Sequence, residues 1–490
     1  MAIFPETSPW NPPMRHTLHP QLEIGACQIA DIRINPKSRD DIPAILIGLQ
    51  HLYMDEALRS CLFDLLETEV LPDVALDNGR PGIPLWSILV MAVLKQGLNC
   101  DFDRLEGLVN HYDVIRQMLG HGVYSDTRYT VQQIKDNVSL LTPSVLSKVG
   151  ALVVESGHRV SKKKPGDWLR GRCDSFVVET DVHYPTDTGL LWDSLRKLLG
   201  LLEEASREDG IPGWRQAKYR RRKLKRLFNR VRRARDAKSR PEQVREYLDA
   251  ARELIDQARC ALEVLSGMVR AEPRLVRMNR IAQYLWYAGR LSDQADRRLL
   301  RGETIPQDEK IFSIFEPHTR WISKGKAGRP VELGVPVCVL EDQYGLLLHH
   351  RVMWKGGDVE VAVPMIGEAR EKYPDLKLCS FDKGFHSPEN RRRLDELLED
   401  NVLPRKGLWT QADRVRETGA VFRAARQQHP AIESAIHNLE HRGLDRVRSH
   451  GVEGFERTVA LSVLACNVHR IGRMIRDRAR EAERRRRRAA

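Results

Sequence analysis

The sequence has few features that would fix a fold covalently or hold it in a membrane. Its eight cysteines are scattered over 490 residues and form no CxxC pair, so we expect neither a disulfide framework nor a zinc site. No apolar run approaches the roughly 18 residues that a membrane span needs. The first residues also lack the apolar segment of a signal peptide. These absences favour a cytoplasmic protein with reduced thiols and no membrane contact.

Acidic residues are too few to balance the basic ones. The chain carries 80 Lys and Arg against 67 Asp and Glu, a formal net charge of +13, which indicates a polyanionic partner, with nucleic acid foremost. The imbalance is greatest between residues 215 and 240, where Asp236 is the only acid. Like charges three and four residues apart destabilise an isolated helix, so this density favours contact with phosphate over a solvated helix face. The candidate contacts here are Arg220, Arg221, Arg222, Lys223, Lys225 and Arg226.

Length and periodicity indicate several domains. Hydrophobic residues make up 41% of the chain, enough for well-formed cores, and 490 residues favour two or three domains. Residues 1–160 show helical periodicity, and a helical block around residues 190–300 contains two stretches spaced like a coiled-coil seam. Outside this block, strands and helices are expected in the order strand, strand, strand, helix, strand, helix, strand, helix. These segments are 170–182, 331–340, 345–353, 361–372, 376–381, 388–398, 401–404 and 431–442.

This order is typical of a ribonuclease H-like fold, a mixed sheet whose first and fourth strands are neighbours. We therefore predict an α/β catalytic core with such a sheet, an all-α N-terminal domain and an α-helical insertion. The predicted boundaries are 1–160 for the N-terminal domain, 166–189 with 311–475 for the catalytic domain, 190–310 for the insertion and 476–490 for a basic tail.

Three acids lie where this fold would bring them together. Asp382 ends a buried strand, directly before a Lys-Gly break and a capped helix, and open α/β sheets usually bind ligands at that edge. Asp174 lies on the first strand, the expected neighbour of the strand that ends at Asp382, and Glu433 lies on a flanking helix. The alternatives are Asp181 and Asp187 for the first acid, and Glu440 for the third.

Such a group of acids favours a divalent metal. Converging carboxylates without cationic partners repel each other, and burial raises their pKa values. Two Mg²⁺ (or Mn²⁺) ions roughly 3.5–4 Å apart activate the attacking oxygen and stabilise the leaving one in phosphodiester displacement. Mg²⁺ prefers oxygen ligands and keeps waters that substrate phosphate can replace. The residue types therefore predict a two-metal site held by Asp174, Asp382 and Glu433.

Four segments of the chain resemble bacterial insertion-sequence transposases of the DDE type, close to the ISNCY group. They are residues 172–194, 311–334, 380–394 (SFDKGFHSPENRRRL) and 432–472. The resemblance implies cut-and-join chemistry at the ends of a mobile DNA element, with cleavage of a strand followed by attack of its 3′-hydroxyl on target DNA. It implies that Asp174, Asp382 and Glu433 are the catalytic triad. It also implies double-stranded DNA as the partner, a homodimer when two ends are synapsed, an N-terminal domain that binds the element ends, and a location at the bacterial nucleoid.

The chain departs from the family pattern around the third acid. Related transposases often carry a Tyr-Arg-Glu-Lys signature there, whereas His429 lies four residues before Glu433 and Glu440 seven after it. Arg442 is the nearby candidate for phosphate contact. The remaining candidates resemble a phosphate-gripping loop or an exposed turn; they are Lys324, Lys326 and Arg329.

Two other functions also fit the sequence. One is a ribonuclease H-like nuclease that cuts DNA without joining it. The other is a basic helical nucleic-acid-binding protein, without enzymatic activity, whose carboxylates are structural.

Overall fold

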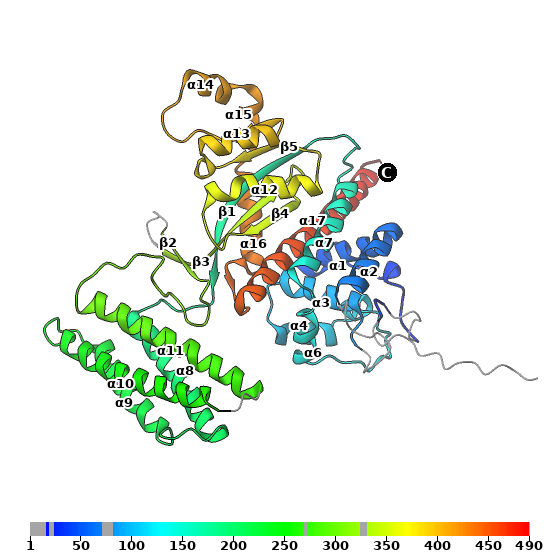
Figure 1. Ribbon diagram of the computed structural model, residues 1–490. Helices are drawn as coiled ribbons and strands as arrows, with labels where there is room; N and C mark the ends of the chain where they lie inside the picture. Colours follow the sequence, from blue (N-terminus) through cyan, green and yellow to red (C-terminus); the bar gives the residue numbers. More distant parts are fainter. Residues whose placement is uncertain (1–15, 19–23, 71–81, 269–271, 324–330, 490) are drawn as a thin grey trace, which may run out of the picture. The chain divides into compact units, whose positions relative to one another are not determined.

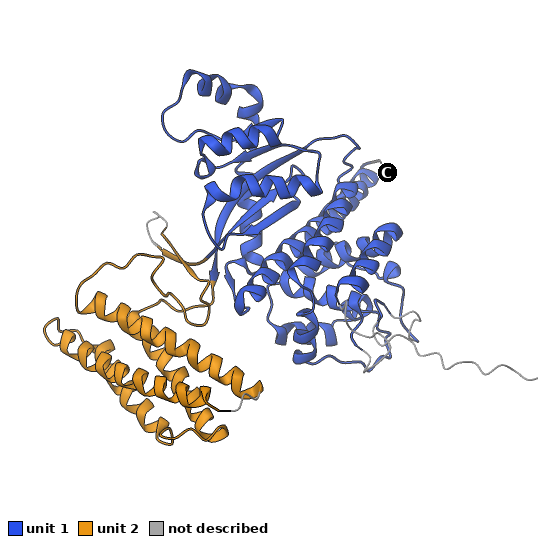
Figure 2. Cartoon of the chain, viewed as in Figure 1, with its two compact units in different colours: residues 1–179, 335–490 blue, residues 180–334 orange. Residues whose placement is uncertain are grey.

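The chain folds into two compact units. The computed structural model describes residues 16–18, 24–70, 82–268, 272–323 and 331–489. The first unit comprises residues 1–179 and 335–490, and the second comprises residues 180–334 (Figure 2). Each unit has its own hydrophobic core.

A mixed sheet lies in the first unit (Figure 1). Its strands are β1 (Leu169–Thr180), β3 (Val331–Glu341), β4 (Leu347–Val352), β5 (Leu376–Phe381), β6 (Asp400–Val402) and the short β7 (Arg446–Val447). The order is β3-β1-β5-β6, with β4 on β3 and β7 on β1. β5 is parallel to both β1 and β6, whereas β3 and β4 form an antiparallel hairpin. The predicted pairing of the first strand with the strand ending at Asp382 is confirmed.

Helices that follow these strands complete the α/β part. They are α12 (Asp358–Lys372), η2 (Lys383–Phe385), α13 (Pro388–Leu397), α14 (Gln411–Thr418), α15 (Ala420–Gln428), α16 (Ala431–Leu439) and η3 (Glu440–Leu444). As predicted, α13 begins at a cap, because the Ser387 hydroxyl accepts from the Asn390 N–H at 3.0 Å and Pro388 occupies the first turn. Apolar residues of α12 share a core with β5, so the start of α12 is held beside the sheet.

The N-terminal helices share a core with the last helix, α17 (Gly451–Ala489). They are η1 (Ile29–Asp31), α1 (Asp41–Met54), α2 (Glu56–Glu69), α3 (Leu85–Gly97), α4 (Phe102–His111), α5 (Asp113–Met118), α6 (Val131–Val138) and α7 (Pro143–Val160). Helices α1 and α17 cross at glycines: a Cβ on Gly472 would lie 1.7 Å from the Ala44 carbonyl oxygen. Residues 1–160 therefore belong to the same compact unit as the sheet, and the predicted division at residue 160 is not seen. The apolar face of α17 contributes Leu461, Leu464, Val468 and Ile471 to their core.

Membrane-spanning segments were also sought among the described helices. None is by itself long and apolar enough to cross a bilayer, and only α6 with α7, bent by 80° relative to each other, passes that test as a pair.

The second unit is a helical bundle with a short strand. It contains α8 (Asp187–Glu208), α9 (Ala217–Arg233), α10 (Arg240–Ser266), α11 (Glu272–Leu299) and β2 (Arg320–Ser323), which pairs antiparallel with the start of β3. The two predicted seams are confirmed, because most of their residues are buried on α10 and α11, which pack against each other, and Leu262 and Leu285 are partly buried against the same core. The predicted insertion, 190–310, lies within this unit.

Candidate active site

Asp174 and Asp382 lie side by side on parallel strands. In the register of β1 and β5, Cys173 is opposite Phe381; Asp174 is the next residue of β1, and Asp382 is the first residue after β5. Cys173 and Phe381 are fully buried, so the residues that precede the two acids are fixed in the core. β5 ends at Phe381, while β1 continues to Thr180. The sheet therefore brings together two of the three predicted acids.

The pKa of the Asp174 carboxyl group is raised by its surroundings. Burial raises its pKa to about 6, and the negative charges of Asp382 and Asp358 add to the increase, while the Ser175 N–H and His429 oppose it. The Ser175 N–H donates to Asp174 Oδ1 at 2.7 Å. A cation next to Asp174 would stabilise its ionised form.

Asp382 is in a different electrostatic environment. His429 Nε2 lies 3.3 Å from Asp382 Oδ1, and this contact lowers the pKa of Asp382. His429 is itself buried, and its Nδ1 is 2.9 Å from the Ser380 hydroxyl. Arg426 donates to the Phe381 carbonyl at 2.7 Å, and its guanidinium lies 3.9 Å from Asp382. These contacts orient the Asp382 carboxylate and keep it ionised.

A third carboxylate beside this pair comes from Asp358, the first residue of α12. The Ser175 hydroxyl donates to Asp358 Oδ1 at 2.5 Å. Ser175 therefore links Asp358 to Asp174, through its hydroxyl on one side and its N–H on the other. Gly384 makes room for this acid, because a Cβ on residue 384 would lie 2.9 Å from Asp358 Oδ2. The glycine that breaks the chain after Asp382 thus also has a steric role.

Glu433, the third predicted acid, lies in the first turn of α16 and is exposed. It follows His429 by four residues, and its N–H donates to the Pro430 carbonyl at 3.1 Å. Within the described ranges, no group of three or more His, Cys, Asp or Glu side chains is arranged to hold a metal ion. The structure therefore joins Asp174 and Asp382, and adds Asp358, but it does not bring Glu433 into contact with them.

The alternative acids have other surroundings. Asp187 is buried in the second unit, where Arg298 donates to both of its carboxylate oxygens. Asp181 lies beyond the end of β1, and the Glu440 carboxylate lies 3.7 Å from His437. None of these positions brings a carboxylate to Asp382 in the way that the β1 register brings Asp174.

The carboxylates present suit Mg²⁺ or Mn²⁺. Asp174, Asp382 and Asp358 offer only oxygen donors, which these ions prefer. Burial, followed by the charges of Asp382 and Asp358, raises the pKa of Asp174, and a bound cation would offset both effects. The chemistry of this donor set therefore fits a divalent cation, with Asp174 and Asp382 as its ligands and Ser175 as a positioning residue.

The predicted phosphate contacts on α9 fall into two groups. Arg220 lies over the Trp214 ring at 4.7 Å and donates to Gln257, while Arg221 is 3.4 Å from Glu203. The others project into solvent from the exposed side of the helix, whose opposite side carries the buried residues of α9. No ion pair joins them to any other residue in the described part of the chain. This basic face of α9 consists of Arg222, Lys223, Lys225 and Arg226.

The remaining predicted contacts differ. Lys324, Lys326 and Arg329 lie outside the described residues. Arg442 is only 5% exposed; its guanidinium donates to the Gly97 carbonyl and lies 3.7 Å from Asp41. The helix breaks at Gly443, whose φ of +91° favours glycine. A guanidinium held in the interior does not face DNA, so Arg442 does not fit its predicted role and instead stabilises the packing of the N-terminal helices.

Sequence reasoning missed three functional candidates: Asp358, Ser175 and Arg426. For Asp358 a signal existed, since Gly356 and Gly357 interrupt the chain after the hairpin and Asp358 begins the next helix. A first-turn acid is common on any helix, however, and only the packing of α12 brings it to Ser175.

We compared the chain with models of protein families, with curated proteins and with solved structures. None of the three comparisons finds a match.

Proposed function

We propose that this protein is a DDE-type transposase that cleaves DNA and transfers the cut strand, in a reaction that needs Mg²⁺ or Mn²⁺. One observation carries the proposal: Asp174 and Asp382 occupy adjacent positions on parallel strands, and Asp174 has its pKa raised by burial and by neighbouring acids. Buried structural carboxylates usually have cationic partners. Asp382 has His429 and Arg426 beside it, so it is the raised pKa of Asp174 that favours an additional cation at this site.

The strand order supports the proposal. The order β4-β3-β1-β5-β6, with β3 and β4 antiparallel and β5 parallel to both β1 and β6, is the order expected of a ribonuclease H-like core. In that fold the first acid and the second lie on neighbouring strands. A ribonuclease H-like core would therefore bring Asp174 and Asp382 together, as the proposed metal site requires.

The residues of this chain then have the following roles. Two bound ions would supply Lewis acidity and charge neutralisation at the scissile phosphate. Asp174 and Asp382 would hold them, whereas the exposed Glu433 of α16 is not in contact with this pair. His429 and Arg426 orient Asp382, and Asp358 orients Asp174 through Ser175.

Binding of DNA is assigned to other parts of the chain. The basic face of α9 would contact the phosphate backbone, because its four cations have no ionic partners among the described residues. The N-terminal helices would recognise the element ends, and two ends would be synapsed by a homodimer. The natural setting of this reaction is the bacterial nucleoid in the cytoplasm.

The test is incubation of the protein and Mg²⁺ with DNA that carries candidate element ends. Joined products would support a transposase. Nicks without joined products would favour the nuclease, and binding without cleavage would favour the non-enzymatic DNA-binding protein. Asp382→Asn is the inactive reference, and Asp445→Asn, a change of an exposed acid, is its matched control.

A further inference from the structure

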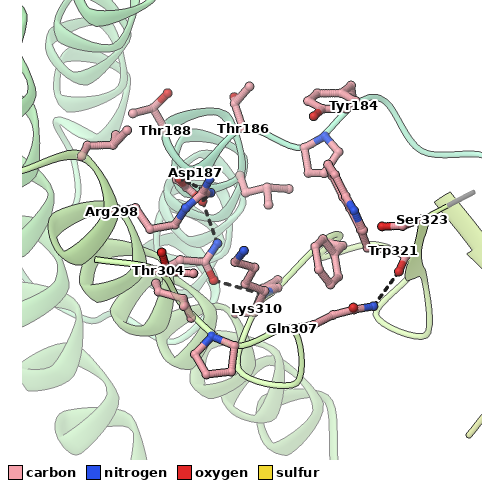
Figure 3. A pocket seen from close by; sticks show the side chains of 18 of the residues that line it. Tyr184, Thr186, Asp187, Thr188, Arg298, Thr304, Gln307, Lys310, Trp321 and Ser323 are labelled. Carbon is pink, nitrogen blue, oxygen red and sulfur yellow. Dashed lines mark hydrogen bonds and ion pairs between the residues drawn. The ribbon is translucent and has the colours of Figure 1, made fainter. Parts of the chain in front are cut away.

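The second unit contains a cavity of about 620 Å³ that the proposed reaction does not use. It lies at the N-terminal end of α8, between residues 184–190, the end of α11, residues 304–312 and β2 (Figure 3). This volume lies within the range of sites that bind small organic molecules.

One wall of the cavity is aromatic. The rings of Trp321 and Phe312 stack with centroids 5.6 Å apart and an interplanar angle of 30°. Tyr184 meets Trp321 edge-on at 5.6 Å and is 65% exposed. Gln307 donates to the Trp321 carbonyl at 2.5 Å and holds the strand in place. This wall offers ring faces and edges to a flat heterocycle.

The opposite wall is polar, and its single acid is already neutralised (Figure 3). Asp187 is 7% exposed; Arg298 donates to both of its oxygens, at 2.9 and 2.7 Å, and Gln294 donates to it at 2.7 Å. The Gln294 carbonyl in turn accepts from the Ile311 N–H at 3.1 Å. The wall is therefore rigid and carries no net negative charge.

The other charged residues of the lining are cations. They are Lys310 and Arg240, and no ion pair joins either of them to a residue within the described ranges. With the Arg298–Asp187 pair neutral, the described lining has a net charge of +2. A ligand with an anionic group beside a flat ring matches this combination of walls.

We propose that this cavity binds a nucleotide, with its base against Trp321 and Phe312 and its phosphate near Lys310 and Arg240. A mononucleotide and an unpaired nucleotide of a DNA strand share this chemistry. The choice of DNA as the source rests on the proposed function, and the experiment distinguishes the two.

The experiment uses the full chain and three probes: a labelled paired duplex, the same duplex with one unpaired adenine, and dAMP. Trp321→Ala should weaken binding of the duplex with the unpaired adenine roughly 5- to 100-fold, the range for loss of one stacked base, and leave the paired duplex unchanged. Trp321→Phe should retain most of the affinity. Trp286→Ala is the matched control, because Trp286 is 58% exposed on α11 and does not line the cavity.

Because Trp321 also packs against Phe312, Lys310→Ala is a second variant that leaves the aromatic wall intact, and it too should weaken the preference for the unpaired base. If dAMP binds and Trp321→Ala abolishes this, free nucleotide is a sufficient ligand. If dAMP does not bind but the preference depends on Trp321, DNA is the source. The proposal is overturned if Trp321→Ala, Lys310→Ala and Trp286→Ala all bind every probe as the wild type does.

Failure of this proposal can be told apart from failure of the proposed function. Asp382→Asn should retain the Trp321-dependent preference in full. If the wild type cleaves DNA but does not prefer the unpaired adenine, the cavity proposal fails and the proposed function stands. If the wild type shows the Trp321-dependent preference but does not cleave, the proposed function fails and the cavity proposal stands.

Discussion

The carboxylate site of the first unit and the basic face of α9 in the second unit are built in opposite ways. At the site, Asp174, Asp382 and Asp358 are set by a strand register, a serine and a histidine. On α9, four cations project from a helix surface and no other described residue holds them in place. The carboxylate site depends on the exact positions of its side chains, whereas the basic face of α9 depends on how many positive charges it carries.

This difference has a functional meaning. A site for chemistry must hold a few atoms in place, so each of its residues matters separately. A surface that contacts phosphates gains affinity from the sum of many exchangeable charges. We therefore expect single substitutions to act sharply at the site and gradually on α9.

The sharpest test of the comparison is Asp382→Asn. It should reduce strand cleavage by more than roughly 100-fold, because loss of a metal ligand costs more than the 10–100-fold typical of its outer partners. DNA affinity, measured by gel shift, should be unchanged. Retained cleavage would remove Asp382 from the site, and Asp445→Asn should behave as the wild type.

The roles of Ser175 and Asp358 predict an intermediate effect. Ser175→Ala and Asp358→Asn should each lower cleavage roughly 10-fold and raise the Mg²⁺ concentration for half-maximal rate, because both leave Asp174 less well oriented. A lower rate with the same Mg²⁺ dependence would argue against positioning. The measurement is the cleavage rate over a Mg²⁺ titration.

The raised pKa of Asp174 predicts a gain in stability when its charge is removed. An acid whose folded pKa is above its unfolded value lowers stability once pH exceeds the unfolded value, and the cost is complete above the folded pKa of about 6. Asp174→Asn should therefore stabilise the fold at pH 8 by roughly 1–2 kcal/mol, after allowance for solvent screening, and have little effect well below the unfolded pKa, near pH 3. Thermal unfolding with EDTA measures this, and adding Mg²⁺ should stabilise only the wild type. If Asp174→Asn and the wild type are equally stable at both pH values, the pKa of Asp174 is not raised in the folded protein.

The smallest effect is expected for one cation of α9. Arg226→Gln should flatten the slope of log affinity against log salt by up to about 0.9, the contribution of one phosphate contact. Arg259→Gln is the matched control, because Arg259 is an exposed arginine on α10 that is already paired with Asp256 at 3.0 Å. Identical slopes for the two variants would mean that Arg226 makes no phosphate contact and that this side of α9 is only a solvated helix face.

The sequence predicted the parts of the site that depend on strands. Asp174 and Asp382 could be paired because the order of strands and helices limits which strands adjoin. Asp358 could not be found this way, since its contact with Ser175 arises only when α12 packs on the sheet. Local pattern shows that a residue starts a helix, but not which residue lies opposite.

The same limit explains the errors elsewhere. Apolar periodicity identified the N-terminal helices, but not that α17 completes their core. The sequence suggests Arg442 as a phosphate contact because it lies close to the third predicted acid along the chain. The break at Gly443 instead directs it towards the Gly97 carbonyl.

The most direct test of the central claim is the binding of Mn²⁺ by the protein, followed by electron paramagnetic resonance. Wild type and Asp445→Asn should bind Mn²⁺ tightly, and Asp174→Asn and Asp382→Asn should each lose that binding. Equal Mn²⁺ binding by all four proteins would contradict the claim that these two strand acids form a metal site.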